Sequence, residues 1–183
     1  MPSLLGADLQ RAQKSIDLQH FLMKDDKAGR VISTSQLLAA DRGVNVRLLL
    51  DDIFISASDD KLFLINEHSN IEVRLLNPAS RRGFSATNFL FDFRPANRRM
   101  HNKSFSVDNA VSIVGGRNIG GKYFELKDNA TFVDFDVFAI GPVVAKISES
   151  FDDFGNHSRA VPIDIVPQPI KSVSLESYRD TYR

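Results

Sequence analysis

Three short apolar segments separated by two helical patterns place the strongest constraint on the fold. The apolar segments are SIDLQHFLM (residues 15–23), VNVRLLLDD (44–52) and IEVRLLN (71–77), and helical spacing covers residues 29–43 and 59–68. Strands with nearly continuous apolar runs are typical of parallel sheets, which are buried on both faces. The order predicts a βαβαβ unit with right-handed crossovers, and therefore an α/β domain.

The rest of the chain is predicted to extend this unit. Further elements are expected at a helix over residues 4–14, a hairpin over 100–116 with Asp108-Asn109 at its turn, a strand over 131–141 and a helix over 142–154.

Two segments lack a regular pattern. Residues 79–99 have no clean period and predict a long excursion over the end of the sheet. Residues 161–183 begin with three closely spaced prolines and predict a linker or tail. We therefore expect a single domain over residues 1–160.

Composition narrows the classes of function. The 183 residues contain 23 basic and 23 acidic side chains, so net charge gives no argument for bulk attraction to nucleic acid or an anionic membrane. The absence of cysteine excludes disulfides and thiolate metal sites. Because the N-terminus resembles neither a secretory signal nor a membrane span, the expected location is the cytoplasm, with any lipid contact at the surface of the inner membrane.

One segment, MHNKSFSVDNAVSIVGGRN (residues 100–118), concentrates groups suited to a phosphate. If His101 and Lys103 lie on a strand, their side chains point to the same face. Gly115 and Gly116 then allow a ligand to approach the backbone, and Asn118 offers an amide donor.

These residue types suggest nucleophilic or acid–base chemistry at phosphorus. Histidine titrates near neutral pH, so His101 is the candidate nucleophile. Lys103 and Asn118 could neutralise the phosphate oxygens without a metal ion. Asp108, at the predicted turn, is expected to support the site indirectly. We predict no cofactor and no metal.

The segment resembles the signature of the phospholipase D superfamily, His-x-Lys-x4-Asp-x6-Gly-Gly/Ser-x-Asn. All six fixed positions match, and further segments such as AADRGVNVRLLLDD and DFDVFAIGP are similar to bacterial cardiolipin synthases of that superfamily. The resemblance covers most of residues 1–160. It implies a phospholipase D-like fold, with a mixed, mostly parallel sheet flanked by helices on both faces.

The resemblance also implies a mechanism. The histidine of the motif, His101 here, attacks phosphorus to form a phosphohistidine, and a second histidine from a second motif protonates the leaving group. A downstream acid orients the first histidine, and Asp134 is the best match, with Asp136 as the alternative. This chain has no second His-x-Lys. Either two chains pair as a homodimer, or the chain is an N-terminal half, which the proline-containing tail favours.

A local basic cluster lies upstream of the motif. Residues 81–103 hold six basic side chains against one acid, and Arg98 and Arg99 are the members predicted to bind the substrate phosphate together with Gly115 and Gly116. Interleaved phenylalanines at 84, 89, 91 and 93 fit either the core or a face that dips into a bilayer, with the core favoured.

Other candidates have simpler explanations. His20 lies at the end of the first predicted strand, where a structural role is the favoured interpretation. Asp51 and Asp52 follow a predicted parallel strand, a position where sites form, but helix capping explains them equally well.

The leading functional hypothesis is phosphodiester transfer or hydrolysis by a phospholipase D-type phosphatidyltransferase, similar to cardiolipin synthase, on a phospholipid such as phosphatidylglycerol. The first alternative is a homodimeric endonuclease on DNA or RNA. The second is an inactive half-domain that acts as a binding module.

Overall fold

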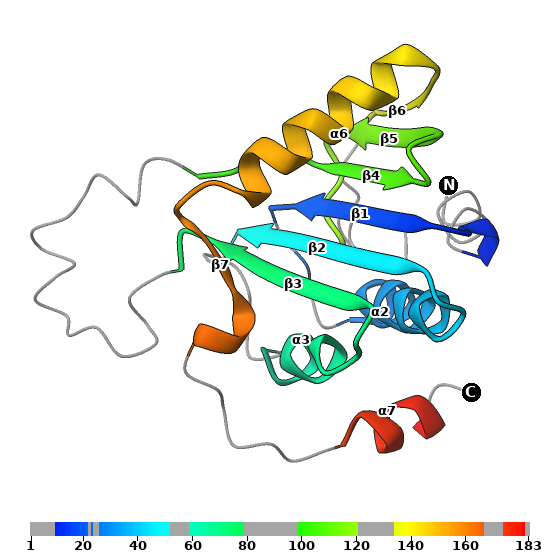
Figure 1. Cartoon of the computed structure of the whole chain (residues 1–183), viewed down its shortest axis with the longest axis vertical. Coiled ribbons are helices and arrows are strands. Elements are labelled where there is room, and N and C mark those ends of the chain that lie inside the picture. Colours follow the sequence, from blue (N-terminus) through cyan, green and yellow to red (C-terminus); the bar gives the residue numbers. More distant parts are fainter. Residues whose placement is uncertain are drawn as a thin grey trace, which may run out of the picture.

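A seven-stranded sheet in the order β6-β5-β4-β1-β2-β3-β7 organises the molecule (Figure 1). The computed structural model describes residues 10–21, 23, 26–51, 59–78, 99–120, 134–166 and 174–181. Its strands are β1 (Ser15–His20), β2 (Asn45–Asp51), β3 (Ile71–Leu76), β4 (Ser104–Val107), β5 (Val111–Gly115), β6 (Asp136–Ile140) and β7 (Ala160–Pro162). Its helices are α2 (Lys27–Asp41), α3 (Asp59–Asn66), α6 (Pro142–Gly155), the 3₁₀ helix η3 (Ile163–Ile165) and α7 (Leu175–Thr181).

The predicted βαβαβ unit is confirmed in strands β1 to β3. Strand β2 pairs in parallel with both β1 and β3, and α2 and α3 form the connections. Asp26 caps the start of α2, and its side chain accepts hydrogen bonds from the backbone N–H groups of Ala28 and Gly29. The turn after α2 includes Gly43 at φ 91°, a conformation that glycine adopts without strain.

The other strands make the sheet mixed, as expected, but less parallel than predicted. Two of the six described pairings are parallel, while β1–β4, β4–β5, β5–β6 and β3–β7 are antiparallel. The reason is that the chain leaves β3 and enters β4 at the same edge of the sheet. The predicted hairpin is confirmed, with Asp108 and Asn109 at φ 54° and 53° in its turn.

Helices cover both faces of the sheet, as predicted. Alternate strand residues such as Leu18, Leu48 and Val73 form the larger apolar core with residues of α2 and α3. The opposite face packs under α6, where Phe151 meets Leu49 in a smaller cluster. Figure 1 shows α6 running across β4 to β6, with α2 and α3 beside β2 and β3.

The face under α6 carries buried charge. Asp17 on β1 is 4% exposed, and its carboxylate binds the Arg47 guanidinium from β2 at 2.6 Å (Nε to Oδ1) and 2.9 Å (NH2 to Oδ2). Arg47 also reaches Asp152 on α6 at 2.7 Å and lies 4.7 Å from the ring centroid of Phe151. Since both members are partnered, this ion pair ties two strands to the helix above them.

The segment predicted as a linker or tail begins with ordered structure. Strand β7 adds Ala160 to Pro162 to the edge of the sheet, and Ile163 is fully buried in the main core. Tyr178 of α7 is also buried, and Arg179 pairs with Asp41 at the end of α2. The expected boundary at residue 160 thus falls inside β7, and the division into domain and tail stays a prediction.

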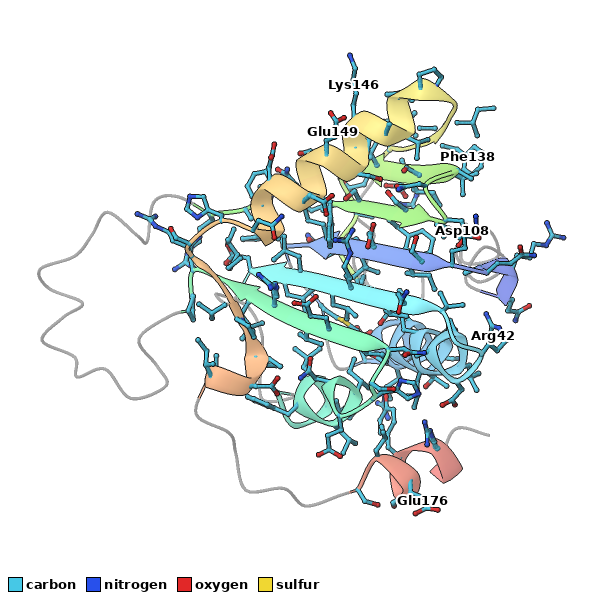
Figure 2. The ribbon with its side chains drawn as sticks, viewed as in Figure 1. Arg42, Asp108, Phe138, Lys146, Glu149 and Glu176 are labelled. Carbon is cyan, nitrogen blue, oxygen red and sulfur yellow. The ribbon has the colours of Figure 1, made fainter. Side chains whose placement is uncertain are left out.

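The opposite edge strand, β6, exposes apolar side chains on both of its faces. Val137, Phe138 and Ile140 are 60%, 51% and 66% exposed, and Phe135, directly before the strand, is 83% exposed. Figure 2 labels Phe138 at this outer edge of the sheet, in line with its exposure.

None of the described helices is both long and apolar enough to cross a membrane. Most of the predicted helix over 4–14 and most of the excursion predicted over 79–99 lie outside the described residues.

Candidate active site

The strand directions bring the chemical groups of the motif to the side of the sheet where the parallel strands have their carboxyl ends. In this subsection, that side is the edge meant. Strands β1, β2 and β3 end at this edge, β4 begins there, and β5 returns to it. Residues 99–103 and 115–118 therefore meet beside the carboxyl ends of the parallel strands. This is the edge at which open α/β sheets bind ligands.

His101 and Lys103 converge there, although not through strand alternation. Residues 100–103 precede β4 in irregular backbone, so the strand starts four residues later than the predicted start at residue 100. The Lys103 side chain reaches back instead, with Nζ 3.2 Å from Nδ1 of His101 and donating to its backbone oxygen at 2.8 Å. His101 is exposed, whereas Lys103 is 6% exposed.

The surroundings of Lys103 make its ammonium form less favourable than it would be in water. Burial lowers the pKa of Lys103, and the negative charge of Asp134 opposes that effect in part. A lysine in this setting is poised to gain stabilisation from an incoming anion, because a phosphate would supply the negative charge that the buried ammonium lacks.

Phe21, directly after β1, touches both members of the pair. Its ring centroid lies 4.8 Å from that of His101, and Lys103 Nζ lies 5.5 Å from the Phe21 centroid. Both distances are within the range of favourable aromatic and cation–π contacts. No pattern in the sequence singles out Phe21, since an aromatic residue at the end of a core strand is common.

The close approach of the segment at β6 requires a glycine at position 115, and the Asp134 side chain crowds Gly116. A Cβ on Gly115 would lie 2.5 Å from the backbone oxygen of Phe135, and one on Gly116 would lie 2.5 Å from Oδ1 of Asp134. Asn118 follows as a buried residue, next to Ile119, which forms an isolated bridge with Met23. The structure thus brings Gly115, Gly116 and Asn118 to the edge that holds His101.

Asp134 lies near the site without contacting the histidine. Its carboxylate packs on Gly116 and acts electrostatically on Lys103, and its backbone oxygen accepts from Arg117 at 3.3 Å. Asp136 instead forms an ion pair with Arg117 at 3.2 Å. Within the described part of the chain, neither acid hydrogen-bonds to His101, so the orienting role of Asp134 or Asp136 stays a prediction.

Asp108 lies away from the other motif residues. It occupies the turn at the opposite end of β4, and its carboxylate accepts backbone N–H groups of Gln13, Lys14 and Ser15 at 2.7 to 3.2 Å (Figure 2). Although burial alone would raise the pKa of Asp108, these hydrogen bonds and the Lys14 charge lower it. Its position supports the indirect role expected at the turn, because β4 separates it from His101.

The predicted arginines fall partly outside the described residues. Arg98, the arginines before it in the basic cluster and the interleaved phenylalanines are outside the described residues. The Arg99 guanidinium donates to Oδ1 of Asp51 at 3.3 Å and to the backbone oxygen of Asn77 at 3.2 Å. Phosphate binding by Arg98 and Arg99 stays a prediction.

Two buried residues at this edge, Asp51 and His20, were not predicted from the sequence to belong to the site. Asp51 is fully buried and binds the segment before His101, as described further below. His20 is 8% exposed, and burial, together with the nearby Lys103 charge, lowers its pKa to about 3. A neutral, buried histidine fits the structural role favoured for His20. The position of Asp51 at the end of a parallel strand was the available signal.

A mixed sheet with a histidine and a lysine converging at a glycine-lined edge defines a domain of the phospholipase D type. The chain belongs to the family described as cardiolipin synthase, PLD-like domain, whose model matches residues 5–154. It is 48% identical over 142 residues to cardiolipin synthase C of Escherichia coli K12, covering 78% of this chain and 30% of that protein. The resemblance found in the sequence is thereby confirmed.

Solved structures support the fold. A phospholipase D family member, Nuc from Salmonella typhimurium, aligns with a TM-score of 0.60 at 19% identity, covering 87% of this chain and 88% of that one. Phosphatidylserine synthase from Haemophilus influenzae aligns with a TM-score of 0.66 at 14% identity, covering 98% of this chain and 41% of that one. The chain spans about a third of the length of the curated relatives it matches.

Proposed function

We propose that this domain supplies one half of a phosphatidyltransferase site, in which His101 forms a covalent phosphohistidine. The observation that carries the proposal is the 3.2 Å approach of Lys103 Nζ to His101 Nδ1 beside Gly115 and Gly116. An exposed nucleophile next to a buried cation suits a phosphodiester. The names of two relatives, cardiolipin synthase C and cardiolipin synthase A, point to the same reaction class.

The proposed reaction has two displacements. In the first, His101 Nε2 forms a bond to phosphorus, the bond from phosphorus to the leaving alcohol breaks, and a second histidine gives the leaving oxygen its proton. In the second, that histidine takes the proton of an acceptor alcohol, whose oxygen bonds to phosphorus as the phosphorus–nitrogen bond breaks. Lys103 and Asn118 stabilise the charge on the non-bridging oxygens, and Asp134 is the proposed orienting acid.

The second histidine must come from another motif. His20, His68 and His157 lack a lysine at the second following position. We propose that a second copy of this chain, or a second motif-bearing half, completes the site. The apolar edge at β6 supports this, because it begins beside Gly115 and Gly116 and leaves Phe135, Val137, Phe138 and Ile140 exposed.

The proposed substrate is an anionic phospholipid of the phosphatidylglycerol type, met by peripheral contact with a membrane surface. Transfer of a phosphatidyl group from one such lipid to the hydroxyl of another would release glycerol. The test is to incubate the protein with phosphatidylglycerol vesicles and to follow glycerol release and phosphohistidine formation by mass spectrometry. We expect both signals from the native chain and neither from His101→Ala.

The matched control is His157→Ala, which removes an exposed histidine outside the site. It is expected to leave both signals unchanged. Turnover that persists in His101→Ala would rule out the proposed mechanism. If the native chain is monomeric by light scattering and inactive, the second half must be supplied before the substrate is judged.

A homodimeric endonuclease remains the alternative. Its support is that the chain covers 88% of Nuc, a phospholipase D family member of similar length. Cleavage of DNA or RNA without lipid, lost in His101→Ala, would favour it over the phosphatidyltransferase. A chain that dimerises and binds lipid but never forms phosphohistidine would instead be an inactive binding module.

A further inference from the structure

We propose that Asp51 is a positioning residue for His101. It acts through Arg99 and Met100, the two residues that precede His101 in the chain. The inference rests on the proposed function, since it assigns His101 the role of nucleophile. Asp51 ends the parallel strand β2 and is fully buried, with 0% of its surface exposed. A carboxylate so deeply buried requires partners, and two that the structure describes, Arg99 and Met100, lie next to the motif.

Each oxygen of the Asp51 carboxylate holds a different part of the segment. Oδ2 accepts the backbone N–H of Met100 at 3.1 Å, and Oδ1 accepts from the Arg99 guanidinium at 3.3 Å. The same Arg99 nitrogen donates to the backbone oxygen of Asn77, which follows β3. The ends of β2 and β3 thus fix residues 99 and 100.

The side chain of Met100 is held from the other side. It is 1% exposed, and its sulfur accepts from Nε2 of Gln19 on β1 at 3.0 Å. The Gln19 oxygen in turn accepts from the hydroxyl of Ser104, the first residue of β4, at 3.3 Å. Residues 101–103 are therefore spanned by anchors at Met100 and at Ser104.

These anchors explain how irregular backbone can carry a nucleophile. Because His101 is exposed and outside any strand, sheet hydrogen bonds do not set its direction. Its orientation depends on the peptide that precedes it, which Asp51 holds, together with the contacts that its side chain makes with Lys103 and Phe21. A shift of about 1 Å in a reacting group can lower a rate by about a hundredfold.

The same contacts affect the role of Arg99. Its guanidinium lies between a buried carboxylate and a carbonyl oxygen, with 18% of the side chain exposed. Part of its hydrogen-bonding capacity therefore serves the backbone before His101. Asp51 and Arg99 form a charged anchor at the entrance to the motif.

The test compares two buried aspartates on the same face of the sheet. Asp51→Asn keeps the shape and an acceptor oxygen but removes the charge. Asp17→Asn is the matched control, because Asp17 is also buried and paired with an arginine, Arg47, but lies opposite Ser106 and away from the site. Both variants are expected to lose stability.

Only Asp51→Asn is expected to impair chemistry. With phosphatidylglycerol vesicles, kcat per folded molecule should fall about tenfold to a hundredfold with KM within about twofold, whereas Asp17→Asn should retain the native kcat. The His101 imidazole NMR signals should shift or broaden in Asp51→Asn alone. Native kcat and unchanged His101 signals in Asp51→Asn would overturn the inference.

Two readouts keep this test separate from the proposed function. If the native chain shows no His101-dependent turnover, the proposed function fails, while the imidazole signals still report on the positioning. If Asp51→Asn does not fold, amide hydrogen exchange of the native chain decides. The Met100 amide should exchange slowly although it lies outside any strand, and rapid exchange would overturn the inference.

Discussion

The Lys103 ammonium donates toward Nδ1 of His101 across 3.2 Å. An ammonium has no acceptor, so the neutral imidazole in this arrangement accepts at Nδ1 and carries its proton on Nε2. Attack on phosphorus by Nε2 requires the other tautomer. The proposed mechanism therefore predicts that substrate binding draws Lys103 away from Nδ1 and leaves that nitrogen free to be protonated.

This tautomer change can be observed with a phosphate mimic. We expect ¹⁵N NMR to show the Nε2–H tautomer of His101 in the free protein, and a change toward Nδ1–H when orthovanadate is added. Lys103→Met should abolish the response because it removes the donor that selects the first tautomer. His157, which is exposed, serves as the internal control, and an Nδ1–H tautomer already present in the free protein would contradict the expectation.

The buried His20 is expected to make the stability of the fold sensitive to acid. Its folded pKa of about 3 lies below the ordinary value of 6.5, so the unfolded chain takes up a proton that the folded protein excludes. The associated stability is complete above pH 6.5 and declines as the pH falls toward 3. Between pH 7 and pH 5, the unfolding free energy should drop by about 2 kcal/mol from this group.

Urea titrations of the native chain and of His20→Phe provide the measurement. The variant replaces a buried histidine whose Nδ1 has no hydrogen-bond partner among the described residues, and it should lose most of this pH dependence. His157→Ala should keep it. An equal decline in the native chain and in His20→Phe would show that other groups cause the acid sensitivity.

Asp108 is expected to contribute to stability rather than to chemistry. Asp108→Ala leaves three backbone N–H groups near residue 14 without their acceptor, which should cost about 2 to 4 kcal/mol of unfolding free energy. Because the folded pKa is lowered, the stability present above about pH 4 should be lost as the pH falls below it. Denaturant unfolding measures both effects, and an intact fold with a hundredfold lower kcat would contradict this assignment.

The β6 edge predicts how the chain associates. Phe138→Lys places a charge on the exposed apolar edge beside the site, and it should convert a dimer to monomer at micromolar concentration. Light scattering on a size-exclusion column is the measurement. Ile165→Lys is the matched control, because Ile165 is also an exposed apolar residue, at 70%, but lies outside β6. This variant should not change the mass. A dimer that survives in Phe138→Lys would place the interface elsewhere.

The sequence predicted the parts of the fold that depend on local patterns. Apolar periodicity located β1 to β3 and their helices, and the Asp108-Asn109 pair located the hairpin turn, because both signals lie within a few residues. Strand β7 was hidden by its proline, which a sheet tolerates at an edge. The mixture of parallel and antiparallel pairs depends on how the chain returns to β4, which no local pattern reports.

The candidate site was predictable in its residue types but less so in its geometry. The spacing of the motif placed His101 beside Lys103, yet the contact arises from the reach of the lysine rather than from strand alternation. Asp51 could not be separated from a helix cap, because its partner Met100 is 49 residues away. Long-range partners of buried polar groups are absent from single-sequence patterns.

The hairpin of β4 and β5 also bears on the order of folding. Its strands are joined by a tight turn, so it can form within microseconds and bring Lys103 near Gly115 by itself. The partners that hold its two ends, Asp51 and the backbone near residue 14, are distant in sequence and join only after large loops close. The open end of the hairpin, where Gly115 bonds to Lys103, should therefore form early in folding, while a correctly aimed His101 should be among the last features to mature.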